Sequence, residues 1–235
     1  MPDVPQRTER KRQQEERRRR TLRSARYAAP YRFNTRARRY IDARGRFVSQ
    51  EVLRAAYNDA LDDAGREVHR LAARLKRGDI TLADWQRTMM RQIKDVHLTS
   101  AAVARGGFEQ LTPADLGRVG QIVRGEYAYL DGFARDLVTG RQPFDGNFPR
   151  RAAMYVDAGS KTFSAEMHAI ATEGGFDEER SYTSDADHCP GCIRERDREW
   201  VARGALVPIG ERDCRASCRC HIVFRRSATG ETFGG

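Results

Sequence analysis

The sequence predicts a mainly α-helical protein, in which a helical body follows an extended basic N-terminal arm and precedes a small cysteine-rich module. Three observations support this fold class. Apolar residues recur with a helical period through the middle of the chain, arginine dominates the first 46 residues, and all five cysteines lie between Cys189 and Cys220. The expected segments are a basic arm at 1–46, a helical domain at 47–176, a cysteine-rich module at 177–226 and a flexible tail at 227–235.

The composition fits a soluble chain with a modest core. Hydrophobic residues make up 39% of the 235 residues and charged residues 32%, with a formal net charge of +10. No apolar stretch approaches the roughly 20 residues that span a bilayer. The N-terminal charges are not followed by the hydrophobic segment of a secretory signal, so we expect the protein to reside in a reducing cytosol.

The positive charge is concentrated in the arm. Residues 1–46 hold 16 Lys and Arg against 5 acidic residues, whereas the other 189 residues hold 27 against 28. Fifteen of these sixteen cations are arginines, whose planar guanidinium groups bind phosphate oxygens and stack on bases. Like charges repel, so the isolated arm should be extended or a fraying helix. The candidate nucleic-acid contacts are Arg7, Arg10, Lys11, Arg12, Arg17, Arg18, Arg19, Arg20, Arg23 and Arg26.

A phosphate polymer such as DNA would neutralise this arm, and the affinity would then fall steeply with salt. An acidic protein surface remains an alternative partner. A solvated tail that only keeps the protein soluble is the simplest alternative, although fifteen arginines exceed what solubility needs.

Three long helices are expected in the body. The first begins at the N-cap Ser49 and ends at Gly78, and the second runs from Thr81 to Gly106. The third begins at Thr112, with Pro113 at its first helical position, and continues to about Thr139. Residues 142–147 should form a turn, followed by two shorter helices at 150–158 and 161–172.

The polar residues of the body indicate a scaffold rather than an enzyme. His69, His97 and His168 are single histidines on helices, which are more often exposed or satisfied in a core than catalytic. Three glycines of the third helix suggest a close helix approach or a bend, since each costs about 1 kcal/mol against alanine; they are Gly117, Gly120 and Gly125. We found no convincing pair of nucleophile and base.

The cysteines have the spacing of a four-coordinate structural zinc site. Cys189-Pro190-Gly191-Cys192 forms a knuckle in which both thiolates face one ion, and a second thiol group follows about twenty residues later. The expected ligands are Cys189, Cys192 and Cys214, with either Cys218 or Cys220 as the fourth and Cys218 slightly preferred. A closed thiolate site offers no position for substrate, so the ion should stabilise the fold rather than catalyse a reaction.

Other interpretations of the cysteines are weaker. An odd number of cysteines in a reducing compartment disfavours disulfides, and no βαβ pattern surrounds the C-x-x-C pair of a redox dithiol. A zinc deaminase would need an H-x-E element, whereas the chain has Glu166-Met167-His168. His188 and His221 flank the cluster and could replace a thiolate. Ile222 to Phe224 should form a final strand.

The cysteine module resembles a known family. The residues concerned are the run from Ala186 to Cys192, then Trp200, then Pro208-Ile209-Gly210, then the run from Cys214 to Ile222. Together they resemble the C-terminal module of tailed-phage head morphogenesis proteins, the phage Mu F-like minor capsid family. The likeness extends to Gly45-Arg46-Phe47-Val48-Ser49 and Ala104-Arg105-Gly106-Gly107, and covers about residues 44–224.

The resemblance implies a low-copy virion component at the portal or head–neck region, recruited in the host cytoplasm during assembly. Its partners would be the portal protein, the major capsid protein or both, with packaged DNA as a further contact. Many members end in His-x-x-Cys-x-Cys, whereas here Cys214 precedes Cys218-Arg219-Cys220, which leaves the fourth ligand open. Residues 1–43 lie outside the resemblance. A free zinc-containing regulator that binds nucleic acid is the alternative function.

Overall fold

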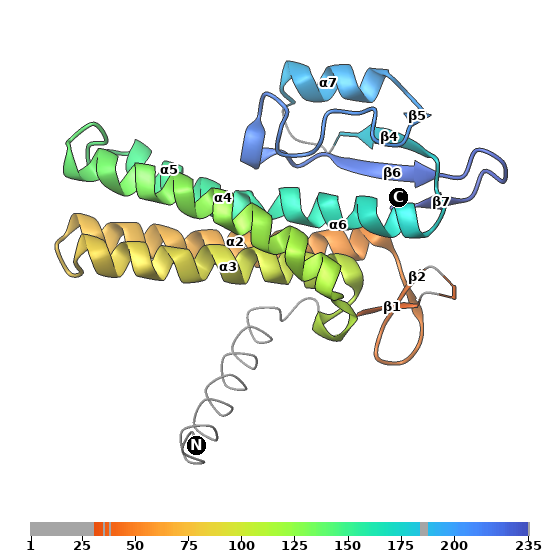
Figure 1. Ribbon diagram of the computed structural model, residues 1–235, viewed down its shortest axis with the longest axis horizontal. Helices are drawn as coiled ribbons and strands as arrows, with labels where there is room; N and C mark the ends of the chain where they lie inside the picture. Colours follow the sequence, from red (N-terminus) through yellow and green to blue (C-terminus); the bar gives the residue numbers. More distant parts are fainter. Residues whose placement is uncertain (1–30, 35, 38, 184–187, 235) are drawn as a thin grey trace, which may run out of the picture.

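The computed structural model describes residues 31–34, 36–37, 39–183 and 188–234, and shows a mainly helical body joined to two small sheets (Figure 1). The body contains α2 (Gln50–Lys76), α3 (Leu82–Arg105), the 3-10 turn η1 (Phe108–Gln110), α4 (Pro113–Val138), α5 (Asn147–Asp157) and α6 (Gly159–Glu173). Among the described residues, no helix is long and apolar enough to cross a membrane.

The expected long helices are confirmed, and their caps explain where they begin. Ser49 Oγ accepts a hydrogen bond from the Val52 amide, and Thr81 Oγ1 accepts one from the Asp84 amide. Thr112 forms a reciprocal capping box at the start of α4. The fourth helix, α5, begins three residues earlier than expected, because the Asp145 carboxylate accepts hydrogen bonds from the first two helical amides.

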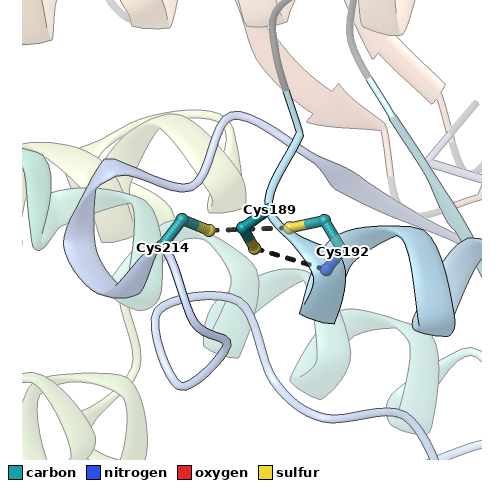
Figure 2. Close-up of side chains that lie close together, drawn as sticks. All are labelled: Cys189, Cys192 and Cys214. Atoms are coloured by element: carbon teal, nitrogen blue, oxygen red, sulfur yellow. Dashed lines mark hydrogen bonds between the residues drawn. The ribbon is translucent and has the colours of Figure 1, made fainter.

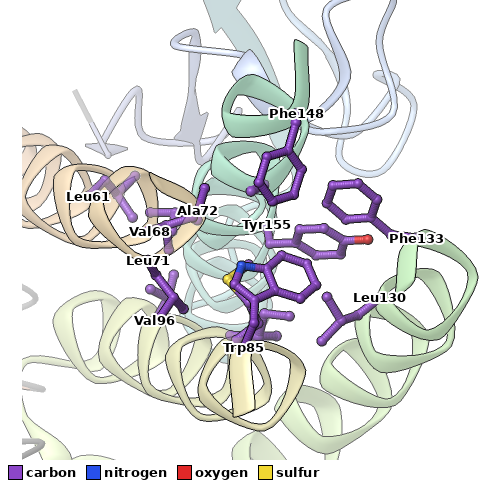
Figure 3. Packing of buried hydrophobic residues seen from close by; sticks show 14 of the residues in the cluster. Leu61, Val68, Leu71, Ala72, Trp85, Val96, Leu130, Phe133, Phe148 and Tyr155 are labelled. Atoms are coloured by element: carbon purple, nitrogen blue, oxygen red, sulfur yellow. The ribbon is translucent and has the colours of Figure 1, made fainter. Parts of the chain in front are cut away.

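Aromatic rings fill the core of the body (Figure 3). Trp85 of α3 is fully buried, and its ring meets Phe133 of α4 edge to face at a centroid distance of 5.4 Å. Phe148 of α5 lies 5.9 Å from Trp85 and 5.8 Å from Phe133. These three rings hold α3, α4 and α5 together, because edge-on aromatic contacts add to the burial of their large apolar surface.

A cluster of buried charges joins α3, α4 and α6. The Arg105 side chain, at the end of α3, lies 2.6 Å from an Asp115 oxygen at the start of α4 and 2.6 Å from a Glu173 oxygen at the end of α6. Glu166 of α6 is 1% exposed and pairs with both Arg105 and Arg118. Because each buried carboxylate faces a guanidinium, the cost of removing these charges from water is offset by pairing.

The pKa directions within this cluster follow from burial and pairing. Burial raises the pKa of Glu166 against the opposing pull of Arg118. At Asp115 burial acts in the same direction, but it is outweighed by hydrogen bonds from Thr112 and by the charge of Arg105, so the pKa of Asp115 is lowered. Both carboxylates thus depend on their guanidinium partners.

The described part of the expected arm, from residue 31 on, is folded into a small sheet, which corrects the prediction of an extended segment to residue 46. The strands β1 (Arg32–Asn34), β2 (Arg39–Ile41) and β3 (Phe47–Val48) form an antiparallel sheet. Tyr40 is 1% exposed, and its hydroxyl donates a hydrogen bond to the Ala104 carbonyl of α3. An aromatic side chain buried in this way outweighs the repulsion between neighbouring arginines.

A second antiparallel sheet forms the C-terminal module. Its strands β4 (Glu178–Tyr182), β5 (Val201–Ala202), β6 (His221–Arg225) and β7 (Thr232–Phe233) have the order β5-β4-β6-β7. The strand expected at 222–224 is confirmed within β6. The helix α7 (Pro190–Asp197) lies on one side of this sheet and α6 on the other (Figure 1).

The expected flexible tail is wrong at residues 232–233, which form β7. Phe233 is 5% exposed, and its ring lies 5.7 Å from that of Phe176. A turn at Gly230, with φ of 72°, brings β7 back alongside β6. The burial of Phe233 therefore fixes this part of the tail.

Phe163 of α6 connects the two cores. It packs against the buried cluster of the body and also against the buried cluster of the module. Its ring stacks on Tyr57 of α2 at 4.6 Å. The body and the module therefore share one continuous apolar contact through α6.

The glycines of α4 do not mark a close helix approach. A Cβ atom at Gly117, Gly120 or Gly125 would meet no atom within 4 Å. The close approach lies at Gly159 instead, where a Cβ would be 2.7 Å from Val96 Cγ1 and 2.8 Å from Ser100 Oγ, both on α3. Gly159 therefore lets α6 pack tightly on α3.

The first prediction concerns this packing. Gly159→Ala should lower the free energy of unfolding by about 1–3 kcal/mol, because the added methyl group overpacks the contact with α3. Gly65→Ala is the matched control, since a Cβ there meets no atom within 4 Å. That control should be stabilised by about 0.5–1 kcal/mol. Urea unfolding midpoints measure both changes, and equal midpoints for the two variants would contradict the close approach.

Candidate metal centre

The first two cysteines lie at the start of α7, and the helix determines their geometry. Cys189 is the N-cap residue and Pro190 occupies the first turn, where a missing amide hydrogen costs nothing. Cys189 Sγ accepts a hydrogen bond from the Cys192 amide at 3.4 Å. Both thiols therefore face the same point (Figure 2).

The other three cysteines lie in the segment that leads into β6. Cys214 precedes the 3-10 turn η2 (Arg215–Ser217), Cys218 follows it, and Cys220 precedes the first residue of β6. Cys218 has an extended backbone, with φ of −68° and ψ of 123°. Cys192 and Cys218 are buried, whereas the other three cysteines are partly exposed.

Asp213 joins the two cysteine segments and was not recognised from the sequence. Its Oδ2 accepts a hydrogen bond from the Gly191 amide at 2.7 Å. A Cβ atom at Gly191 would lie 2.9 Å from the same oxygen, so only glycine lets the carboxylate approach the knuckle this closely. The available signal was an acidic residue directly before Cys214, together with the glycine of the C-x-x-C pair.

The structure brings all five thiols into one cluster that could hold a metal ion. Cys192 Sγ lies 3.5 Å from Cys214 Sγ and 3.6 Å from Cys218 Sγ. The cluster consists of two groups of three thiols that share Cys192, and within each group the sulfur atoms lie within 4.8 Å of one another. The groups are Cys189, Cys192 and Cys214, and Cys192, Cys218 and Cys220.

These separations match the edge of a thiolate tetrahedron. A zinc–sulfur bond of about 2.3 Å implies about 3.8 Å between two sulfur ligands of the same ion. Neither His188 nor His221 belongs to either group among the described residues. His221 instead stacks on the Tyr182 ring at 5.5 Å, and burial lowers its pKa to about 4.

The thiols differ in how readily they lose a proton. A hydrogen bond from the Cys220 thiol lowers the pKa of Cys218 to about 5, in spite of the burial of Cys218. The same pairing raises the pKa of Cys220. The Cys218 sulfur also lies 3.6 Å from Cys192 Sγ, which favours Cys218 over Cys220 as the fourth ligand.

The structure bears in two ways on the interpretation of Cys189 and Cys192 as a redox dithiol. The C-x-x-C pair does begin a helix, as it does in dithiol oxidoreductases. However, the flanking strands β4 and β5 pair antiparallel, so they do not form the parallel βαβ unit of those enzymes. All five cysteines are free thiols in the structure.

The structure places the other candidate functional residues in different surroundings. The ten cations of residues 7–26 lie outside the described residues. His97 is fully buried and its Nδ1 lies 2.6 Å from Thr162 Oγ1, which makes it a core residue. His69 is exposed, and His168 lies 3.5 Å from the Glu179 carboxylate.

No family model, curated protein or solved structure matches this chain.

The second prediction concerns metal content. The purified full-length chain should carry one zinc ion, and Cys192→Ser should lose it, because Cys192 belongs to both thiol groups. Arg196→Ser is the matched control, since this exposed residue of α7 forms an ion pair with its neighbour Asp197 and is not one of the clustered cysteines. Elemental analysis after gel filtration measures the stoichiometry. Unchanged zinc in Cys192→Ser would show that Cys192 is not the ligand shared by the two thiol groups.

Proposed function

We propose that this protein is a structural component of a tailed-phage head, of the minor capsid or head morphogenesis class, associated with the portal or head–neck region. The proposal is supported by the way the family-like residues come together in one core. Cys189, Cys218 and Ile209 are separated by up to 29 positions in the chain but belong to or pack against one core. The residues that resemble the family therefore form a folded unit rather than scattered matches.

In this function a zinc ion would lock the module. Cys189, Cys192, Cys214 and Cys218 would be its ligands, because the sulfur atoms of Cys214 and Cys218 are both within hydrogen-bond range of Cys192 Sγ. Four thiolates complete the coordination of the ion, which leaves it no position for water or substrate. Its binding free energy would add to the stability of the fold, because the ion would tie α7 to the segment before β6, which Asp213 also joins.

The connection between module and body suits an assembly protein. Lys161 of α6 pairs with Glu211, and Arg219 lies 3.5 Å from Asp62 and 3.7 Å from Asp157 of the body. Together with the shared contact at Phe163, these ion pairs favour a unit that presents one fixed surface to a partner. The portal protein and the major capsid protein are the proposed partners.

The basic arm would contact packaged DNA or an acidic neighbouring surface. This part of the proposal rests on charge, because residues 1–30 hold ten Lys and Arg against four acidic residues. Arginine binds phosphate without reading base sequence, so the contact would be strong at low salt and non-specific.

The third prediction tests the class of protein. In cells that assemble the phage, the tagged chain should sediment with heads and bind purified portal protein. The Cys192→Ser variant should be depleted from the head fraction, and Arg196→Ser should not. A chain that stays in the soluble fraction under all conditions would favour the regulator instead.

The fourth prediction concerns the arm. Deleting residues 1–30 should weaken DNA binding and flatten its dependence on salt, by about 0.9 in the logarithmic slope for each lost phosphate contact. The deletion stops before β1, so that Tyr40 and its contact with α3 remain. Affinities at several salt concentrations give the slope.

The matched control replaces Arg66 and Arg70 with alanine. Both are exposed on α2 and already pair with Asp63 and Glu67. This variant should retain the slope of the full chain. If the deletion leaves the slope unchanged, contact between the arm and DNA is overturned, which points to a protein partner or a solvated tail instead.

A further inference from the structure

The cluster contains five thiols, whereas tetrahedral zinc takes four. With Cys189, Cys192, Cys214 and Cys218 as the proposed ligands, the surplus thiol is Cys220, which belongs to the same three-thiol group as Cys192 and Cys218. In an extended chain, residues two positions apart project to the same side. The extended backbone at Cys218 therefore explains why both thiols approach Cys192.

We propose that Cys220 is an exchange ligand: in the zinc-loaded protein it carries the one free thiol of the cluster, and it can replace Cys218 in the coordination of the ion. This inference rests on the proposed zinc site. It identifies a ligand that moves on and off the metal and a thiol that soft electrophiles can modify.

Cys220 is more exposed than Cys218. Cys218 is 2% exposed, whereas Cys220 is partly exposed. Both line a cavity of about 60 Å³ between α2, α6 and the module. The wall of this cavity includes Tyr57, Phe163 and His221. Because both cysteines line the cavity, it is the greater exposure of Cys220 that would let a small reagent reach it before Cys218.

The exchange needs only a local movement. Arg219 lies between the two thiols and is held by Asp62 and Asp157, and β6 begins at His221 with its pairing to Tyr182. Side-chain rotation on either side of this anchored residue would move one sulfur away and the other toward the ion.

The chemistry of the exchange is balanced. A bond would form between the ion and the Cys220 sulfur, and the bond between the ion and the Cys218 sulfur would break. The proton of the Cys220 thiol would move to the released Cys218 thiolate. The ion would have four thiolates before and after the step, its charge would be unchanged, and no oxidant would be required.

The fifth prediction compares three variants of the full chain. Cys218→Ser and Cys220→Ser should each retain one zinc ion per chain, whereas Cys218→Ser/Cys220→Ser should lose it. Brief treatment of the zinc-loaded proteins with N-ethylmaleimide, followed by peptide mass mapping, should modify Cys220 in the wild type. Neither single variant should be modified at the cluster.

The outcomes separate this inference from the proposed zinc site. A wild-type chain without zinc would overturn both. Zinc in the wild type but none in Cys218→Ser would overturn the exchange role alone. Modification of Cys218 in the wild type, or of all five cysteines equally, would overturn the assignment of the free thiol. This last readout uses only the wild type, so it holds even if Cys218→Ser does not fold.

Discussion

The packing of α3 against α6 is the constraint on which the rest of the structure depends. Gly159 permits the close contact at one end of α6, and the guanidinium of Arg105 holds the other end through Glu166 and Glu173. The N-terminal sheet then rests on the last turn of α3 through Tyr40, and the module rests on α6. Each of these contacts needs the two helices at a fixed separation, because close-packed interiors tolerate little change in volume.

The helices were predictable from the sequence because their signals are local. Ser49, Thr81 and Thr112 each mark a helix start through a hydrogen bond made within the next three residues. The N-terminal sheet was not predictable, since its strands have only two or three residues and lie among arginines, which obscure any alternation. The buried charges at Arg105 were also missed. A charged residue in a helix is usually exposed, and only the fold shows that three helix ends meet there.

The candidate metal centre was also predictable only in part from the sequence. Cysteine spacing predicted that two distant segments would meet, and the structure brings all five thiols together. What spacing could not supply was the part played by Asp213, whose carboxylate holds the Gly191 amide across 22 positions of the chain. Spacing favoured Cys218 over Cys220 only slightly. That distinction depends on burial and on which thiol donates a hydrogen bond to the other, and both are properties of the folded chain.

Phe163 has a consequence for evolution as well as for folding. A ring shared by two cores makes their unfolding cooperative, so a ligand that binds one core raises the stability of both. By mass action, a metal ion present at 100 times its dissociation constant adds about 2.7 kcal/mol. This added stability would extend to the helical body, tens of residues from any thiol. Substitutions in the body that would otherwise unfold the protein could then persist wherever the metal is plentiful, and their effect would become visible only under metal limitation.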